Sequence, residues 1–186
     1  GHPIATFGAI RHKIGEMTAR TYAVESLMYR TAGLIDAALE GTSHTRAEVA
    51  SAFEEFAVEA SIAKVAGTET LDFVLDENIQ IHGGNGYVKE YGAERYYRDA
   101  RVNRIFEGTN EINRLLIPGT LLKRALTGKL ALMDEFGRVQ EALAAGRLPE
   151  KGKGPLAELR QQTEYSKYTA LFVLQAAARR YMQDIA

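Results

Sequence analysis

The chain has 186 residues, of which 46% are hydrophobic and 25% charged, so it is long enough to fold around an apolar core. Its 23 basic and 24 acidic residues leave a net charge of −1, which argues against nucleic acid as a partner, and the absence of cysteine excludes disulfides and thiolate metal sites. No apolar run approaches the ~20 residues that a membrane span requires, and no targeting segment is recognisable.

The first half of the chain predicts two long amphipathic helices. Apolar side chains recur at three- and four-residue steps over residues 3–40, which predicts one long helix. Thr45 and Glu48 have the spacing of a capping box, and the apolar stripe that follows predicts a second helix. The sequence Gly-Gly-Asn-Gly over residues 83–86 ends this helix, since glycine readily adopts the positive φ of a turn.

Shorter segments follow. We expect a short helix over residues 92–98, an extended segment over residues 102–106 and a helix over residues 110–126. No segment alternates apolar and polar side chains convincingly, as a half-buried strand does. The sequence therefore predicts an all-α fold in which the helices form an antiparallel bundle.

The character of the sequence changes after the bundle. Apolar spacing predicts one helix over residues 130–143 and another that begins near Leu156, and the charged, proline- and glycine-containing residues 147–155 between them are predicted to form an exposed linker. We therefore divide the chain into a bundle over residues 1–127 and a helical extension over residues 128–186. Because the first residue is not methionine and the last residues resemble the middle of a helix, we interpret the chain as a piece of a longer protein and the extension as incomplete.

One carboxylate stands out because of its neighbours. Glu107 follows the large apolar residues Ile105 and Phe106, and apolar surroundings suit a general base that removes a proton from carbon, because they disfavour the charged form of a carboxyl group. Gly108 would allow a ligand to approach the backbone closely. The alternative is a loop carboxylate before a helix start at Thr109, where negative charge is favourable in any case. Spacing alone favours this alternative.

Three motifs together resemble the C-terminal helical domain of the acyl-CoA dehydrogenase flavoproteins. They are Gln-Ile-His-Gly-Gly-Asn-Gly-Tyr over residues 80–87, Arg-Asp-Ala-Arg over residues 98–101 and Ile-Phe-Glu-Gly-Thr over residues 105–109. The resemblance covers residues 1 to about 126 and implies an antiparallel four-helix bundle, without the N-terminal helical domain and the β-domain of the family. The tail from Lys129 resembles the extension of the very-long-chain subgroup and its bacterial relatives.

This resemblance implies roles for individual residues. Glu107 matches the catalytic base of the family, and Gly108 matches a residue that lies along the substrate thioester. The residues implied to contact FAD are Gln80, Gly83, Gly84, Thr109 and Glu111. The first three match a segment that reaches the adenine end of an FAD held by a neighbouring subunit. Thr109 also suits a helix N-cap and Glu111 a first-turn charge, and both kinds of role can hold at once. Gly8 departs from the glutamine of many family members.

The implied activity is the α,β-dehydrogenation of acyl-CoA thioesters in fatty-acid β-oxidation, with FAD as cofactor. The resemblance further implies an electron-transfer flavoprotein as electron acceptor, a homo-oligomeric state, and a location in the cytoplasm of a bacterium or the mitochondrion of a eukaryote. We expect the isolated chain to be inactive and not to retain FAD. Two alternatives remain: an acyl-CoA oxidase, which passes electrons to oxygen, and a non-catalytic helical interaction module.

The remaining polar residues predict structural roles. None of the four histidines forms the Glu-x-x-His pair of di-iron bundles, so we expect no metal site. His82 is interpreted as a packing or capping residue. Arg95, Arg98, Arg101 and Arg104 alternate with acidic residues, and we expect them to form ion pairs between helices.

Overall fold

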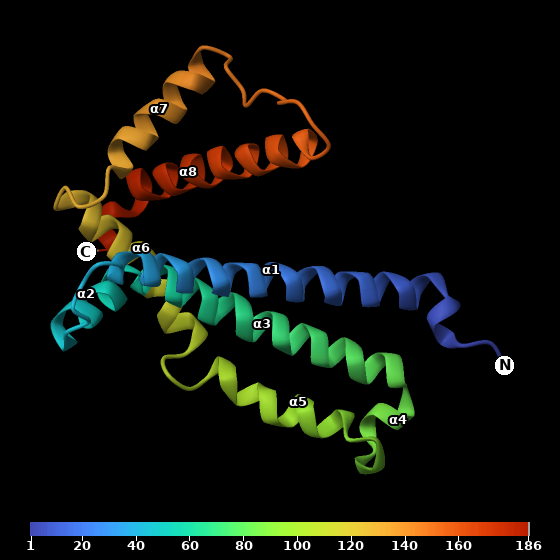
Figure 1. Ribbon diagram of the computed structural model, residues 1–186. Coiled ribbons are helices and arrows are strands. Elements are labelled where there is room, and N and C mark those ends of the chain that lie inside the picture. Colours follow the sequence, from blue (N-terminus) through green and yellow to red (C-terminus); the bar gives the residue numbers. More distant parts are fainter. Residues whose placement is uncertain (186) are drawn as a thin grey trace. The chain divides into compact units, whose positions relative to one another are not determined.

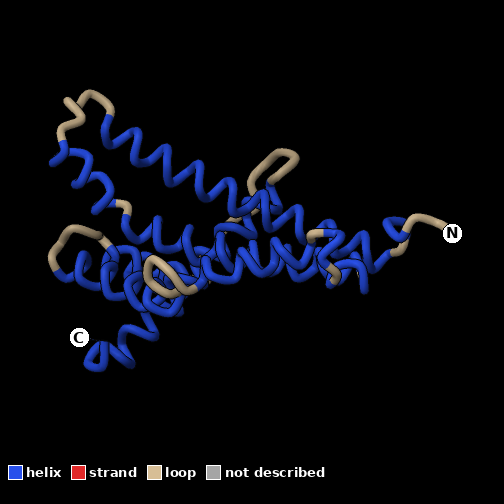
Figure 2. Tube along the Cα trace, turned by 90° about the horizontal axis from the view of Figure 1, so that it is seen from below, coloured by secondary structure: helices blue, strands red, loops and turns tan. Residues whose placement is uncertain are grey.

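The computed structural model describes the backbone of residues 1–185 and the side chains of residues 1–181. Over these residues the backbone forms helices, turns and loops and contains no strand, which confirms the predicted all-α fold (Figure 2). The chain divides into two compact units, Gly1–Pro118 and Gly119–Ala186. Within the described residues, no helix combines the length and the apolar character needed to cross a membrane.

The first unit is organised around the long helix α3. Its elements are η1 (Ile4–Thr6), α1 (Gly8–Leu39), α2 (Arg46–Glu55), α3 (Ala57–His82), α4 (Gly84–Tyr87), η2 (Lys89–Tyr91), α5 (Ala93–Arg101), η3 (Val102–Arg104) and the first part of α6 (Asn110–Leu126). Helix α3 packs against both α1 and α5 and runs antiparallel to each of them (Figure 1). This arrangement places the loop that follows α5 and η3 next to the first half of α3.

Each of the two long predicted helices is interrupted by a residue with non-helical backbone angles. Pro3 precedes a 3-10 turn, and Phe7 has extended backbone angles (φ −74°, ψ 135°) before α1 begins at Gly8. The second helix is interrupted at Phe56, whose backbone (φ −99°, ψ 23°) separates α2 from α3. The apolar stripe continues across each interruption, so periodicity alone does not locate it.

The segment over residues 102–106 was predicted to be extended, and this prediction was wrong. The backbone N–H groups of Ile105 and Phe106 both donate to the carbonyl oxygen of Val102, at 2.9 Å and 3.1 Å. These local bonds satisfy the backbone polar groups in helical geometry, whereas an extended segment would need a neighbouring strand as partner.

The predicted helix signals at Thr45 and Gly83 are confirmed. Thr45 Oγ1 accepts a hydrogen bond from the Glu48 N–H at 3.3 Å, and Glu48 Oε2 accepts one from the Thr45 N–H at 2.8 Å, which completes a capping box. The side-chain and backbone hydrogen bonds from Thr45 hold the pKa of Glu48 below its ordinary value. Gly83 follows α3 with a φ of +58°, a conformation that favours glycine.

The buried apolar side chains of the first unit are small. They are Ala52, Val58, Val65 and Ala93. By contrast, Tyr22, Met28 and Tyr29 on α1 expose 71%, 58% and 73% of their surfaces. Small buried residues let neighbouring helices approach α3 closely, whereas the exposed residues form an apolar surface of α1 that the rest of the first unit does not cover.

The second unit contains the end of α6 and a helical hairpin (Figure 1). The hairpin consists of α7 (Leu132–Ala144) and α8 (Ala157–Ile185), which pack against each other. Helix α7 buries Leu132, Phe136 and Val139, which lie on one face because they are three or four residues apart. Both helices were predicted from their apolar spacing.

Substitution of Gly86 by alanine is expected to destabilise the protein. A Cβ at this buried position would lie 2.5 Å from the carbonyl oxygen of Ile79, a backbone atom that cannot easily move away. Such overpacking costs roughly 1–3 kcal/mol. The matched control is Gly84→Ala, because a Cβ there would meet nothing within 4 Å. Urea unfolding followed by circular dichroism compares the two variants, and equal midpoints would contradict the expectation.

Substitution of Thr45 by alanine is expected to raise the pKa of Glu48 toward its ordinary value, because the Thr45 side chain is the main cause of the lowered value. A carboxyl group with a lowered folded-state pKa stabilises the protein above its unfolded-state pKa, and this stabilisation is lost as the pH falls through the folded-state pKa. The wild-type chain should therefore lose more stability than Thr45→Ala on acidification. An NMR titration of the Glu48 carboxyl group measures the shift, and an unchanged pKa would count against it.

Candidate active site

Glu107 lies on a left-handed turn in the loop between η3 and α6. Glu107 and Gly108 have φ angles of +54° and +77°. Glycine adopts such angles easily, but the left-handed conformation costs a residue with a side chain roughly 1–2 kcal/mol. Residues of this kind persist only where their surroundings hold them, and they are concentrated at functional sites.

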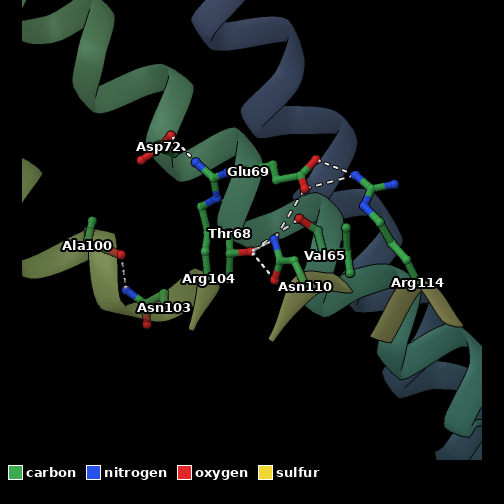
Figure 3. A network of polar contacts seen from close by, with 9 residues as sticks. All are labelled: Val65, Thr68, Glu69, Asp72, Ala100, Asn103, Arg104, Asn110 and Arg114. Carbon is green, nitrogen blue, oxygen red and sulfur yellow. Dashed lines mark hydrogen bonds and ion pairs between the residues drawn. The ribbon is translucent and has the colours of Figure 1, made fainter. Parts of the chain in front are cut away.

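Polar contacts with α3 hold this loop, and Asn110 is at their centre (Figure 3). The residue is 2% exposed. Its Nδ2 donates to Thr68 Oγ1 at 3.0 Å and to Glu69 Oε1 at 3.3 Å, and its Oδ1 accepts from Lys64 Nζ at 2.7 Å. Asn110 was not predicted as a site residue, because its partners Lys64 and Thr68 lie more than forty residues earlier in the chain. Its role follows only from the contacts with α3.

The carbonyl oxygen of Gly108 is fixed by two side-chain donors. Lys64 Nζ donates to it at 2.8 Å and Asn113 Nδ2 at 3.0 Å. Asn113 Nδ2 also lies 3.1 Å from the carbonyl oxygen of Thr109. The peptide unit that follows the left-handed turn is therefore bonded to both α3 and α6.

Two ion pairs connect the same region to α3 (Figure 3). Arg104 Nη1 contacts Asp72 Oδ2 at 2.7 Å, and Arg114 Nη2 contacts both carboxylate oxygens of Glu69, at 2.7 Å and 2.8 Å. Hydrogen bonds from Arg114 and from the Asn110 amide hold the pKa of Glu69 below its ordinary value. The lowered pKa favours the ionised form of Glu69, which accepts hydrogen bonds from Asn110 and Arg114 of α6.

Thr109 and Glu111 occupy the helix-start positions expected from the sequence. Thr109 Oγ1 accepts a hydrogen bond from the Ile112 N–H at 3.2 Å, as an N-cap residue does. Glu111 lies in the first turn of α6, where the helix dipole favours negative charge. A hydrogen bond from its own backbone N–H and a further one from Thr109 lower the pKa of Glu111.

The apolar surroundings expected around Glu107 are not supplied by this chain. Ile105 and Phe106 are 54% and 48% exposed, and Glu107 is itself exposed. Within the described residues, its carboxylate has no hydrogen-bond or ion-pair partner. The expectation was wrong for the chain alone, because residues that adjoin in sequence need not pack over one another.

Gln80, Gly83 and Gly84 lie at the other end of α3, exposed. A Cβ on either glycine would meet nothing within 4 Å, so their backbone is open to an approaching ligand and fits an FAD contact. From Thr68, next to the start of α6, to Gln80 the helix rises about 18 Å. The residues implied to contact FAD therefore form two separate groups, one at the start of α6 and one at the end of α3.

The other polar residues have local partners. His82 Nδ1 lies 2.8 Å from a carbonyl oxygen of its own helix. Arg95 pairs with Asp99 at 3.8 Å and Arg98 with Glu94 at 3.9 Å, all within α5, so the expected pairing between helices was wrong for these residues. In the part of the chain that the structure describes, no group of three or more histidine, cysteine or acidic residues could hold a metal ion.

Comparison with known proteins identifies relatives of the chain. The family profile described as "Acyl-CoA dehydrogenase, C-terminal domain" matches residues 1–122. The chain is 46% identical over 190 residues to a probable acyl-CoA dehydrogenase of Bacillus subtilis (strain 168), covering 98% of the chain and 32% of the relative. It is 40% identical over 117 residues to the mitochondrial very long-chain specific acyl-CoA dehydrogenase of Rattus norvegicus, covering 63% of the chain and 16% of the relative. The chain thus spans a third or less of the length of these curated relatives.

The fold leads to the same group of proteins. The chain is similar to the crystal structure of an acyl-CoA dehydrogenase complexed with FAD from Bacillus anthracis, with a TM-score of 0.93 and 44% sequence identity. This match covers 99% of the chain, the α7–α8 hairpin included, and 32% of the solved chain. The chain therefore belongs to the acyl-CoA dehydrogenase family, and the profile match identifies its first part as the C-terminal domain of that family.

Proposed function

We propose that this chain carries the catalytic base of an FAD-dependent acyl-CoA dehydrogenase that catalyses the α,β-dehydrogenation of acyl-CoA thioesters in fatty-acid β-oxidation. The observation that carries the proposal is the conformation of Glu107. Its carboxylate is exposed and has no partner within the described residues, while its backbone has a left-handed conformation next to an anchored carbonyl group. A carboxylate with only a structural role would more often be paired or capping a helix.

The proposed chemistry removes two hydrogens from adjacent carbon atoms. Glu107 accepts the α-proton of the acyl-CoA thioester, and the electrons of that C–H bond form the α,β double bond as the β-hydrogen leaves with its electron pair. Bound FAD supplies the acceptor for that hydride. Gly108 has no side chain, so the thioester can lie along the backbone beside the base.

The two separated groups of cofactor residues support a homo-oligomer. In this proposal Thr109 and Glu111 contact the FAD at the site of Glu107, whereas Gln80, Gly83 and Gly84 contact the FAD of a neighbouring subunit. The rise of about 18 Å along α3 between the groups suits this division. The apolar surface of α1 formed by Tyr22, Met28 and Tyr29 offers area that other subunits or domains would cover.

The electrons must leave the reduced cofactor before a second turnover. An electron-transfer flavoprotein is the proposed acceptor, and an acyl-CoA oxidase, which uses oxygen, is the alternative within the same superfamily. Oxygen consumption distinguishes the two.

A non-catalytic helical interaction module is the alternative from another class, and it requires that the full-length protein bind neither flavin nor acyl-CoA. The proposed location is the cytoplasm if the protein is bacterial and the mitochondrion if it is eukaryotic, and the relative from Rattus norvegicus is named as mitochondrial. The proposed domain boundary lies between residues 127 and 128.

Substitution of Glu107 by glutamine tests the proposal in a full-length enzyme that contains this chain. Glutamine retains the shape of the side chain but cannot accept the proton. General-base catalysis typically contributes about 10²–10⁴-fold, so the rate constant of flavin reduction by acyl-CoA should fall by at least that much. Stopped-flow bleaching of the flavin measures this rate constant.

Flavin content and acyl-CoA affinity serve as internal controls for this variant. Both should remain near the wild-type values, because the substitution adds no bulk. If Glu107→Gln reduces its flavin at the wild-type rate, Glu107 is not the base, and the proposed function of this segment is refuted.

The isolated chain is expected not to retain FAD. Gln80, Gly83, Gly84 and Glu111 are exposed and Thr109 is half-buried, so neither group of cofactor residues encloses a ligand. Dialysis of the purified chain after incubation with FAD, followed by an absorbance spectrum, measures retention. A preparation that stays yellow would show that the described residues form a complete flavin site.

A further inference from the structure

The loop that carries Glu107 is fixed on both sides by one face of α3. Lys64, Thr68 and Asp72 are spaced four residues apart and so lie on the same side of the helix. Asp72 holds Arg104 before Glu107, and Lys64 holds the carbonyl oxygen of the residue after it, at 2.7 Å and 2.8 Å respectively. Figure 3 shows Thr68 and Asp72 of this face directed toward the loop.

Lys64 is unusual among these residues because its charge is directed at neutral oxygen atoms. Its ammonium group donates to the carbonyl oxygen of Gly108 and to Asn110 Oδ1 at 2.7 Å. Among the described residues, none of the ion pairs includes Lys64. A lysine with only a solvation role would extend its ammonium group into water. Lys64 is partly buried, and both of its acceptors belong to the segment that adjoins Glu107.

These contacts hold the backbone turn from which the Glu107 side chain extends. Glu107 and Gly108 form a turn with two successive positive φ angles, which a glutamate does not adopt without external support. Lys64 and Asn113 bond the carbonyl oxygen at the end of this turn from two different helices. Without the ammonium group, one of the two donors is lost and the turn is free to relax toward ordinary backbone angles.

We propose that Lys64 is a positioning residue for the catalytic base, which holds the left-handed turn at residues 107–108 and thereby aims the Glu107 carboxylate at the substrate. The inference rests on the proposed function, in which Glu107 is the base. Lys64 itself touches neither substrate nor cofactor in this mechanism.

Substitution of Lys64 by methionine tests the inference in a full-length enzyme that contains this chain. Methionine keeps most of the length and packing of lysine but donates no hydrogen bond. A misplacement of about 1 Å can cost about 10²-fold in rate, so the rate constant of flavin reduction should fall by about this factor while acyl-CoA affinity stays near wild type. Lys64→Arg, which retains a charged donor, should recover part of the rate.

The matched control is Lys13→Met. Lys13 is also partly buried and also bridges two helices, through an ion pair between its Nζ and Glu77 Oε2. Its removal should lower stability without changing the rate constant of flavin reduction. Single-turnover measurement separates the two effects, because the rate constant does not depend on the fraction of folded, flavin-loaded enzyme.

A second readout does not depend on activity. Amide hydrogen exchange over residues 104–112 should become faster in Lys64→Met and stay unchanged in Lys13→Met, since only the first variant releases the turn. If Lys64→Met does not fold, Asn113→Ala removes the other donor to the same carbonyl oxygen and should show the same two effects.

The outcomes distinguish this inference from the proposed function. A wild-type rate constant in Lys64→Met, or an equal loss in Lys64→Met and Lys13→Met, overturns the positioning role. If Glu107→Gln is inactive in the same assay while Lys64→Met is normal, only the positioning role is refuted. If Glu107→Gln itself reduces flavin at the wild-type rate, the proposed function fails.

Discussion

The contact between α3 and the start of α6 is the constraint on which the candidate site depends. Asn110 is almost completely buried, and its amide group both donates and accepts hydrogen bonds within that contact. A buried amide is tolerated only when its polar atoms are paired, because an unpaired one costs roughly 1–3 kcal/mol. The partners Lys64 and Thr68 therefore determine where α6 begins, and the loop that holds Glu107 must end at that point.

Helix α3 also determines which functional residues can act together. Thr68 lies beside the turn that carries Glu107, and Gln80 lies about 18 Å further along the same helix. A helix does not bend sharply without a local cause such as proline, so this distance is a property of the fold rather than of one conformation. The residues implied to contact FAD therefore lie in two groups along this chain, and the family resemblance assigns the group at residues 80–84 to the FAD of a neighbouring subunit.

Several apolar side chains, near Glu107 and on α1, are exposed because this chain alone does not cover them. Ile105 and Phe106 are half exposed beside the Glu107 carboxylate, which has no partner among the residues that the structure describes, and Tyr22 and Tyr29 are largely exposed on α1. A base that acts on a weakly acidic carbon needs water to be excluded from its surroundings. In the proposed enzyme the other domains and subunits supply this cover, in keeping with a chain that spans 32% of its Bacillus subtilis relative.

Local signals in the sequence determined the helices, their caps and the motif around the base. Helical periodicity predicted α1, α3, α7 and α8 in outline, and the capping box and glycine stop formed as expected, because these features depend on side chains only a few residues apart. Local bonding also explains why the extended geometry predicted for residues 102–106 was wrong. The backbone N–H groups of Ile105 and Phe106 donate to the carbonyl oxygen of Val102, so the segment needs no strand partner. The FAD roles remain proposals that follow from family resemblance.

Only the tertiary structure decided what holds Glu107 in place. Lys64 and Thr68 precede Gly108 and Asn110 by more than forty residues, and their hydrogen bonds form only once α3 and α6 have packed. No spacing rule connects positions so far apart in the chain. The interruption at Phe56 and the exposure of Ile105 were likewise decided by packing, because burial depends on which elements meet in space, whereas periodicity records only which face of an element is apolar.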